Sequence, residues 1–360
     1  MLRRLIAILL GLFIILALLL GSAYGGLYWW FHHGGEVSTR AHSIDGAGAI
    51  EVLEETPINL YAGDGVVLFE IPRGAHRRGI ARSLEERGFL TPQQWNQWAV
   101  RLFMPNARFQ AGVYALNDGE TPAQLWTRFA RGNQHLFSIT FVEGSEFKHW
   151  QAQLEAHPYI RSQLGDTPVS EIMSILGSDH GHPEGLLFPD TYRFYAGTTD
   201  LRIYQQAFQR MQTVLQQEWE QRDRTVPLST PYEALVLASI VERETGATHE
   251  RGLVASVFVN RLHTGMRLQS DPTIIYGLGD RYRGVIYRSD IQEHTPYNTY
   301  RIDGLPPTPI AMPGAAAIRA TLQPESSEYY YFVSRNDGTH VFSRTLAEHN
   351  RAVNQYQRNR

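Results

Sequence analysis

The stretch LASIVERETG, residues 237–246, places Glu242 and Glu244 at the polar end of an apolar run. A helix turns by about 100° per residue, so two side chains two positions apart point about 200° apart and cannot share one face. A carboxyl group on the buried side would be desolvated, and its pKa would rise above the ordinary glutamate value of about 4.3. Such a carboxyl keeps its proton near neutral pH, as a general acid must.

The apolar pattern of the predicted helix indicates which glutamate faces inward. Glu244 continues the bulky stripe through Leu237 and Val241, whereas Glu242 continues the stripe through Ser239. We therefore expect Glu244 to lie deeper and to be the better candidate for the acid. Spacing alone leaves another reading open, in which both glutamates are surface residues paired with nearby arginines.

A dense run of polar and aromatic residues follows the two glutamates. Amides and carboxylates can bond sugar hydroxyls, and tyrosine rings can stack on the apolar face of a pyranose. Taken singly, each residue is better explained as a turn former or a core tyrosine, but as a cluster they favour a carbohydrate-binding cleft. The candidate binding residues are Asn260, Gln269, Asp271, Tyr276, Tyr297 and Asn298.

Other kinds of site find little support in the sequence. There is no HExxH, GxSxG, P-loop or DxDxDG motif, and the chain has no cysteine for a thiolate site or a disulfide. The loop SDHGHPEG groups Asp179, His180 and His182, but a metal site needs three or four ligands in a workable geometry. We expect neither a metal nor a cofactor. The balance of 33 basic and 36 acidic residues gives no support for a nucleic-acid partner.

The N-terminus predicts a membrane anchor. Arg3 and Arg4 precede an uncharged stretch, and Leu5–Tyr24 has the length of about 20 residues that a bilayer core requires. Four aromatic residues follow, as an interfacial belt would, namely Tyr24, Tyr28, Trp29 and Trp30. The positive-inside rule leaves the N-terminus in the cytoplasm and the rest of the chain outside it. Small residues in GSAYGG leave a cleaved signal peptide open, although its apolar region would be shorter, about 7–15 residues.

The remaining chain predicts two mixed α+β domains behind the anchor at 1–30. Residues 31–60 lack clear periodicity and are interpreted as a tether. Strand, turn and helix patterns occur twice in 61–139, which predicts a small α+β domain. Helical patterns dominate 140–356, and together with a few strands they predict a larger α+β domain. Because the exported part is net acidic, we expect no attraction of this part to anionic lipid.

Local patterns place several elements within these domains. The stretch TPQQWNQWAVRLFM predicts a helix within 91–104, with Trp95, Trp98 and Leu102 on one stripe. Thr121 and Pro122 start another helix. In the larger domain, the predicted helices are 204–222, 231–244, 250–262 and one beginning at Gly314, and Asn336-Asp337-Gly338 is the turn of a hairpin.

Several long motifs closely resemble the YceG-like endolytic murein transglycosylases, the family also called MltG. ASIVERET, ASVFVNRLHTGMRLQSDPTIIYGLG, YNTYRIDGLPPTPIAMPG and YYYFVSRNDGTHVFS occur in family order, with EGLLFPDTY upstream of them. The resemblance covers about Val142 to Asn350, and the anchor and the small domain also fit. The first domain is similar to the family's LysM-like module, with a weaker match.

The resemblance implies a single-pass protein of the bacterial inner membrane, with its catalytic domain in the periplasm. It implies cleavage of the MurNAc-β-1,4-GlcNAc bond within peptidoglycan strands to leave 1,6-anhydro-MurNAc ends, beside the peptidoglycan synthases that make nascent strands. The family's catalytic glutamate falls on the second glutamate of ERET, which is Glu244, and Glu242 is the second choice. The upstream motif adds Glu184 and Asp190 as residues that line or brace the cleft.

The implied chemistry needs only one protein carboxyl. Protonated Glu244 would donate to the glycosidic oxygen, and the resulting carboxylate would take the proton of the C6 hydroxyl that attacks C1 of the same MurNAc. Two alternatives stay open. A hydrolytic glycosidase needs a second carboxylate, for which Asp271 is the candidate. A non-catalytic scaffold would use the LysM-like part for wall binding alone.

Overall fold

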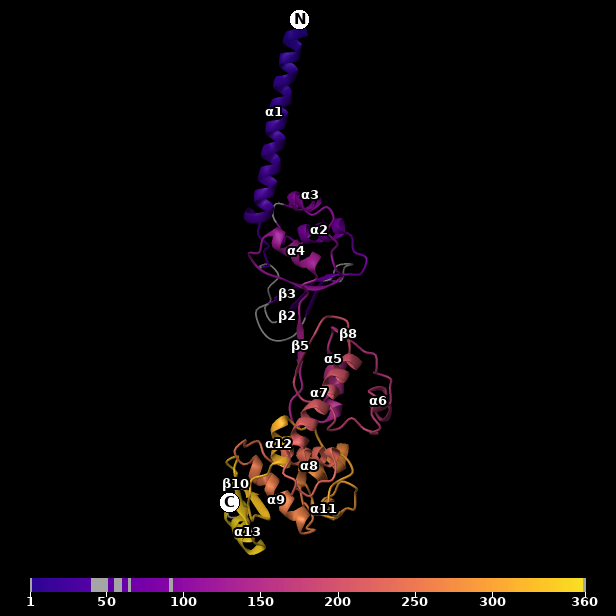
Figure 1. The fold of residues 1–360 in the computed structure, drawn as a ribbon, viewed down its shortest axis with the longest axis vertical. Coiled ribbons are helices and arrows are strands. Elements are labelled where there is room, and N and C mark those ends of the chain that lie inside the picture. The colour runs from indigo at the N-terminus through magenta and orange to yellow at the C-terminus, as the bar shows by residue number, and fades with distance from the viewer. Residues whose placement is uncertain (1, 40–50, 55–59, 64–65, 91–92, 359–360) are drawn as a thin grey trace. The chain divides into compact units, whose positions relative to one another are not determined.

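The structure, a computed structural model, describes residues 2–39, 51–54, 60–63, 66–90 and 93–358 (Figure 1). It has the predicted mixed α+β character and divides into two compact units. The first unit is Met1–Phe137 with Arg193–Ala196, and the second is Ser138–Tyr192 with Gly197–Arg360. The main division therefore falls close to the domain boundary expected near residue 139.

The first unit begins with one long apolar helix, α1 (Leu2–Trp29). Together with the π-helical turn η1 (Trp30–Gly34), it has a mean hydropathy of 3.0 over its most apolar window, and none of that window is buried. By length and composition this helix could cross a membrane.

The chain directly after α1 is packed into the first unit. Trp30 and Phe31 are 3% and 1% exposed, and they join Val37 in the same core as Leu84 and Trp126. Trp30 of the predicted interfacial belt and Phe31 and Val37 of the predicted tether therefore lie in a core of the first unit, whereas the extent of the tether stays a prediction. Within the same tether prediction, residues 40–50 and 55–59 lie outside the described residues.

An antiparallel sheet and three helices form the rest of the first unit. The strands lie in the order β1 (Glu51–Glu54), β2 (Leu60–Gly63), β3 (Val66–Ile71) and β4 (Gly112–Leu116). The helices are α2 (Arg77–Glu86), α3 (Gln93–Phe103) and α4 (Pro122–Arg131). Thr121 Oγ1 accepts a hydrogen bond from Gln124 N at 3.3 Å, so α4 starts at the predicted cap.

The second unit begins with short strands and helices. β5 (Phe137–Thr140) pairs with β7 (Thr191–Phe194), and β6 (Ile160–Arg161) pairs in parallel with β8 (Thr198–Thr199). The helices of this part are α5 (Phe147–Ala156), α6 (Val169–Ile175) and α7 (Asp200–Glu220), which is the longest helix of the unit.

Helices dominate the remainder of the second unit, as predicted. They are α8 (Pro231–Glu244), α9 (Arg251–His263), α10 (Asp271–Leu278), a 3-10 turn (Gly279–Arg281), α11 (Arg288–Gln292), α12 (Ala315–Leu322) and α13 (Leu346–Val353), with a π-helical turn (Asn354–Arg358) after them. β9 (Tyr331–Ser334) and β10 (His340–Ser343) form the expected hairpin, in which Asn336 and Gly338 have φ of 66° and 87°.

The helix that carries the two glutamates is the central helix of this second unit. Residues 234–241 of α8 are all buried, since α7, α9, α10 and α12 pack around it. Its first turn is fixed by Thr230, whose side chain accepts from Glu233 N at 3.2 Å. A helix enclosed on every side holds the residues at its C-terminal end in defined positions.

Candidate active site

Glu242 faces a proline-rich loop and is held by it. Its Oε2 accepts a hydrogen bond from Gly314 N at 2.9 Å, and its Oε1 lies 3.4 Å from an Arg251 nitrogen. One turn earlier on the same stripe, Ser239 Oγ accepts from Ile310 N at 2.9 Å. The Glu242 side chain is only 6% exposed, and burial raises its pKa. This carboxyl fixes the loop to α8.

Both glutamates are of intermediate exposure as whole residues, and the loop around Gly314 covers the Glu242 side. Burial raises the pKa of both carboxyls, and that of Glu244 reaches about 7. The expectation that Glu244 lies deeper stays a prediction. The alternative in which both glutamates are surface residues is wrong, although Glu242 does lie near Arg251 as that alternative expected.

Glu244 ends α8 and opens into a cavity of about 380 Å³. Ser270 Oγ donates a hydrogen bond to its Oε1 at 2.5 Å. The pKa of Glu244 is raised to about 7, mainly by burial. The Ser270 hydrogen bond and the Arg261 charge lower it, and the Asp271 carboxylate raises it. The carboxyl is therefore enclosed by protein yet reachable from the cavity, with a pKa near neutrality.

Arg261, on α9, supplies a fixed positive charge in the wall of this cavity. The residue is 6% exposed, and its guanidinium donates to Leu268 O at 2.6 Å and to Tyr330 O at 2.7 Å. It also lies 5.3 Å from the centre of the Tyr331 ring. These contacts hold the guanidinium in place, so its positive charge acts on the Glu244 carboxyl by electrostatic attraction.

The segment between α9 and α10 brings two predicted binding residues to the cavity. Gln269 is exposed, and its backbone has φ of 50°, a conformation that side-chain-bearing residues rarely adopt. Its N–H bonds Thr299 O at 3.1 Å. Asp271 is also exposed, and its Oδ1 accepts from the Tyr300 hydroxyl at 2.7 Å. Strained backbone at a polar cavity is typical of functional sites.

The C-terminal elements form a wall that the sequence analysis did not predict. Tyr331 and Phe332 from β9, His340 from β10, and Leu346 and His349 from α13 line the cavity. The only signal was the motif YYYFVSRNDGTHVFS, which was interpreted as a hairpin and given no place in the site. Ser270, which holds Glu244, was also missed, although it lies inside a quoted motif.

Two predicted binding amides do not line this cavity. The Asn260 amide donates to Ser327 O and to Tyr329 O, both at 3.0 Å. The Asn298 amide donates to three backbone carbonyls, the nearest being Glu293 O at 2.6 Å, and the residue is 1% exposed. Both amides tie loops together, so their hydrogen-bonding capacity is occupied by the protein.

Three other candidates form a separate cluster, in which Glu184 is buried and the two tyrosines are half-buried. The Glu184 carboxylate oxygens lie 3.1 and 3.2 Å from Phe147 N, and Oε2 lies 3.4 Å from the Tyr276 hydroxyl. Tyr276 meets Tyr297 edge to face with ring centres 4.9 Å apart. Burial raises the pKa of Glu184 to about 8. None of these residues lines the cavity at Glu244, and Glu184 holds the start of α5 through Phe147 N.

The last predicted residue and the histidine-rich loop also lie elsewhere. Asp190 pairs with Arg210 at 2.8 Å and does not line the cavity. His180 stacks on Tyr232 with ring centres 4.2 Å apart. Within the described part of the chain, no group of three or more histidine, aspartate or glutamate side chains converges to hold a metal.

Comparison with known proteins gives consistent matches. The model of the YceG-like family matches residues 69–355. An endolytic murein transglycosylase of Bacillus subtilis (strain 168) is 31% identical over 309 residues, which cover 81% of this chain and 84% of that protein. One of Streptococcus pneumoniae (strain D39) is 30% identical over 317 residues, 79% of this chain and 57% of that longer protein.

A solved structure shares the fold. The crystal structure of a YceG-like protein from Listeria monocytogenes aligns with a TM-score of 0.53 at 26% identity. The alignment covers 79% of this chain and 98% of that one.

Proposed function

This chain belongs to the YceG-like family, and from that premise we propose that it is an endolytic lytic transglycosylase of peptidoglycan. The proposed bond is MurNAc-β-1,4-GlcNAc inside a glycan strand, and the proposed product end is 1,6-anhydro-MurNAc. The observation that carries the proposal is Glu244, whose pKa is raised to about 7 at the edge of a polar cavity. Relatives of this chain that are named endolytic murein transglycosylases support peptidoglycan as the substrate.

In the first step, protonated Glu244 donates its proton to the glycosidic oxygen while the C1–O bond breaks. A pKa of about 7 keeps a large fraction of the side chain protonated at neutral pH. As the proton leaves, the new carboxylate is stabilised by the Ser270 hydroxyl and by the Arg261 charge, the two groups that lower its pKa. The Asp271 carboxylate, in the same cavity, favours the positive charge that develops on the sugar ring.

In the second step, the Glu244 carboxylate takes the proton of the C6 hydroxyl, and that oxygen attacks C1 to close the anhydro ring. The nucleophile belongs to the substrate, so one carboxyl serves as acid and then as base. Gln269, Asp271, Tyr300 and Tyr331 are the side chains proposed to hold the sugars, since they line the cavity from three separate segments.

The proposed location follows from α1. We place α1 across the inner membrane with Arg3 and Arg4 in the cytoplasm and the rest of the chain in the periplasm. There the enzyme would meet newly made glycan strands close to the membrane and end their elongation. Peptidoglycan synthases beside it belong to this proposal as expected partners.

Mass analysis of digested peptidoglycan tests the chemistry. Wild type releases fragments with 1,6-anhydro-MurNAc ends, and Glu244→Gln lowers their rate of release by at least about a thousandfold, because an amide cannot donate the proton. Glu242→Gln is the matched control, since it removes a neighbouring carboxyl that faces Gly314. It retains most of the activity when assayed below its unfolding temperature. Full-rate anhydro release by Glu244→Gln would refute the role of Glu244.

Hydrolysis is the second candidate, and one observation favours keeping it. Asp271 lines the same cavity as Glu244, as the second carboxylate of a glycosidase would. The same mass analysis separates the two reactions, because hydrolysis leaves reducing ends that are heavier by one water. A scaffold without activity would leave the glycan unchanged in every variant.

A further inference from the structure

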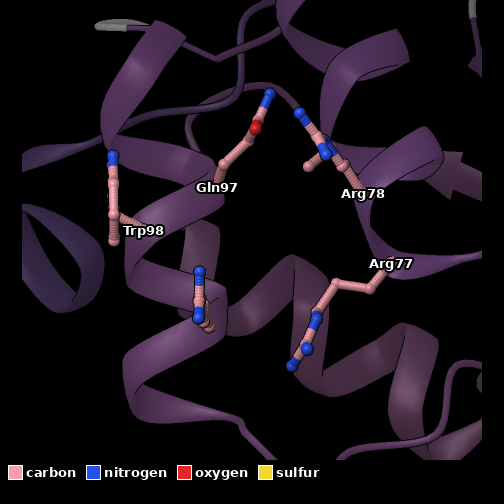
Figure 2. A pocket seen from close by; sticks show the side chains of 6 residues that line it. Arg77, Arg78, Gln97 and Trp98 are labelled. Atoms are coloured by element: carbon pink, nitrogen blue, oxygen red, sulfur yellow. The ribbon is translucent and has the colours of Figure 1, made fainter.

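A basic pocket lies between α2 and α3 in the first unit. It encloses about 440 Å³ and is lined by Arg77, Arg78, Ala81, Gln97, Trp98 and Arg101. Figure 2 shows Arg77 and Arg78 on one helix and Gln97 and Trp98 on the other, around the same space. Among the described residues, none of the three arginines makes an ion pair with a carboxylate. Arg77 donates to Pro105 O at 3.3 Å and Arg101 lies 5.8 Å from the centre of the Trp98 ring, so the positive charges of the pocket are not neutralised by these contacts. Three guanidinium groups without a carboxylate partner around one pocket fit an anion.

Large apolar side chains are exposed beside this pocket. Trp95, Trp98 and Leu102 are 44%, 58% and 49% exposed, whereas Ala99 and Val100 on the inner side of α3 are fully buried. The predicted stripe of α3 therefore points away from the core of its own unit. Arginines next to exposed tryptophan and leucine are the composition of a surface that enters a bilayer interface.

Contacts within the first unit place α3 at the level of that interface. Phe103, the last residue of α3, packs edge to face on Tyr24 and Tyr28 of α1, with ring centres 5.4 and 5.5 Å apart. Counted from Leu5, about 20 helical residues fill a hydrocarbon core of about 30 Å, so its outer edge lies near Tyr24. Figure 1 shows α3 on the side of the small domain from which α1 emerges.

The residues that connect α1 to the small domain are packed into that domain. Trp30 lies 5.9 Å from Trp95 between ring centres, and Phe31 is 1% exposed in the domain core. A domain joined to a membrane helix through its own core residues stays close to the bilayer surface, and the tilt of the whole unit decides whether the α2–α3 side touches the headgroups.

We propose that this α2–α3 face, made of Arg77, Arg78, Trp95, Trp98, Arg101 and Leu102, docks on the bilayer surface and takes the phosphate of an anionic phospholipid headgroup in its pocket. The inference rests on the proposed membrane anchoring and not on the proposed chemistry. The net charge of −3 for the whole chain hides this local basic surface, so the expectation that the exported part avoids anionic lipid holds for the average only.

A spin label reports the docking in the full chain. Because the chain has no cysteine, Leu102→Cys creates a single labelling site on the face, and Asn133→Cys creates a control site outside it. The labelled proteins are placed in nanodiscs of phosphatidylcholine alone or mixed with phosphatidylglycerol. The label at 102 is expected to become accessible to oxygen and protected from a nickel chelate in the anionic discs, and the label at 133 is not.

Charge removal gives the sharper comparison. Arg78→Gln with Arg101→Gln should lower the ratio of docked to undocked protein about 25-fold on anionic discs, since each arginine near such a surface strengthens binding about fivefold. Arg131→Gln with Arg193→Gln, two exposed residues that do not line the pocket, is the control of equal charge and should leave the ratio unchanged.

Three results would overturn the docking. They are equal nickel accessibility at positions 102 and 133, an equal effect of both arginine pairs, or protection of the label by soluble glycan strands but not by phosphatidylglycerol. Failure of the protein to elute with the discs would overturn the anchoring as well. Absence of anhydro products would refute the proposed chemistry and leave this result standing, so the two failures are distinguishable.

Discussion

At the scale of single residues, the two neighbouring glutamates differ through what surrounds them. Glu242 is bonded by a backbone N–H and lies near a buried arginine, so its lone pairs serve the fold. Glu244 has one hydroxyl donor, Ser270, and a free side toward the cavity. Burial raises the pKa of both, but only Glu244 can exchange its proton with a molecule in the cavity.

The pH dependence of the reaction follows from Glu244. The acid must carry its proton, so kcat/KM should be constant below a pH of about 7 and fall about tenfold per pH unit above it. Initial rates of anhydro-end release measured between pH 5 and 9 give the falling, alkaline limb of this pH–rate profile. A rate that still rises through pH 8 would rule out Glu244 as the acid.

Two neighbours should move that limb in opposite directions. Ser270→Ala removes a hydrogen bond that lowers the pKa of Glu244, so the limb moves to higher pH. Asp271→Asn removes a negative charge that raises the pKa, so the limb moves to lower pH. Shifts on the order of one pH unit or less are expected. Movement of both limbs in the same direction would contradict this electrostatic account.

At the scale of elements, α8 assigns the two glutamates their places. One stripe bonds the loop before α12 through Ser239 and Glu242, and the C-terminal end delivers Glu244 to the cavity. The apolar period predicted α8 itself with correct ends, because an uninterrupted run of buried residues leaves little choice. It could not predict which stripe a distant loop would cover.

The candidate site could be predicted only in part, because a local sequence pattern does not encode contacts with distant segments. Glu244, Gln269 and Asp271 do line one cavity, and two of these follow α9 closely in sequence. Asn260 and Asn298 bond backbone carbonyls of segments up to 69 residues away, which no local pattern encodes. The wall from β9, β10 and α13 depends on long-range packing and was invisible for that reason.

A buried carboxyl at the start of α5 should make stability depend on pH. Glu184 has an ordinary pKa of 4.5, which burial raises to about 8 in the folded chain. Between these values the folded state holds a proton that the unfolded state has lost, so the free energy of unfolding decreases as pH rises through this window.

Glu184→Gln should remove this dependence. The amide keeps an oxygen for Phe147 N and has no charge to bury. At pH 8.5 the free energy of unfolding of the variant should therefore exceed that of wild type by on the order of a few kcal/mol at most, with a higher unfolding temperature. At pH 4.5 the two proteins should be nearly equal. Thermal unfolding at both pH values measures it, and an equal difference at both would contradict the assignment.

At the scale of the whole molecule, the anchor helix and the small domain are one structural unit. Val37 N donates to Glu120 O at 2.8 Å, and Ser38 N donates to Phe89 O at 2.9 Å, so the chain after α1 is fixed on both sides. The basic α2–α3 face and the exposed α1 therefore belong to one body. The sequence suggested a tether here because residues 31–60 show no clear apolar periodicity, and single buried residues such as Phe31 and Val37 form no such pattern.

This unity predicts where the chain can be shortened. Removal of residues 1–29 leaves every fully buried residue of this core in place and takes away the partly buried Leu27 packed against it, whereas removal of 1–39 takes away Trp30, Phe31 and Val37 as well. Phe31→Ala in the full chain tests the same packing, and it should destabilise the first unit by about 3–5 kcal/mol, because it leaves a cavity among buried aromatic rings. His33→Ala, at an exposed position of the same turn, is the matched control and should cost less than about 0.5 kcal/mol. Calorimetry in detergent would follow the transition of the first unit, and equal unfolding temperatures for the two variants would mean that the chain after α1 is a tether after all.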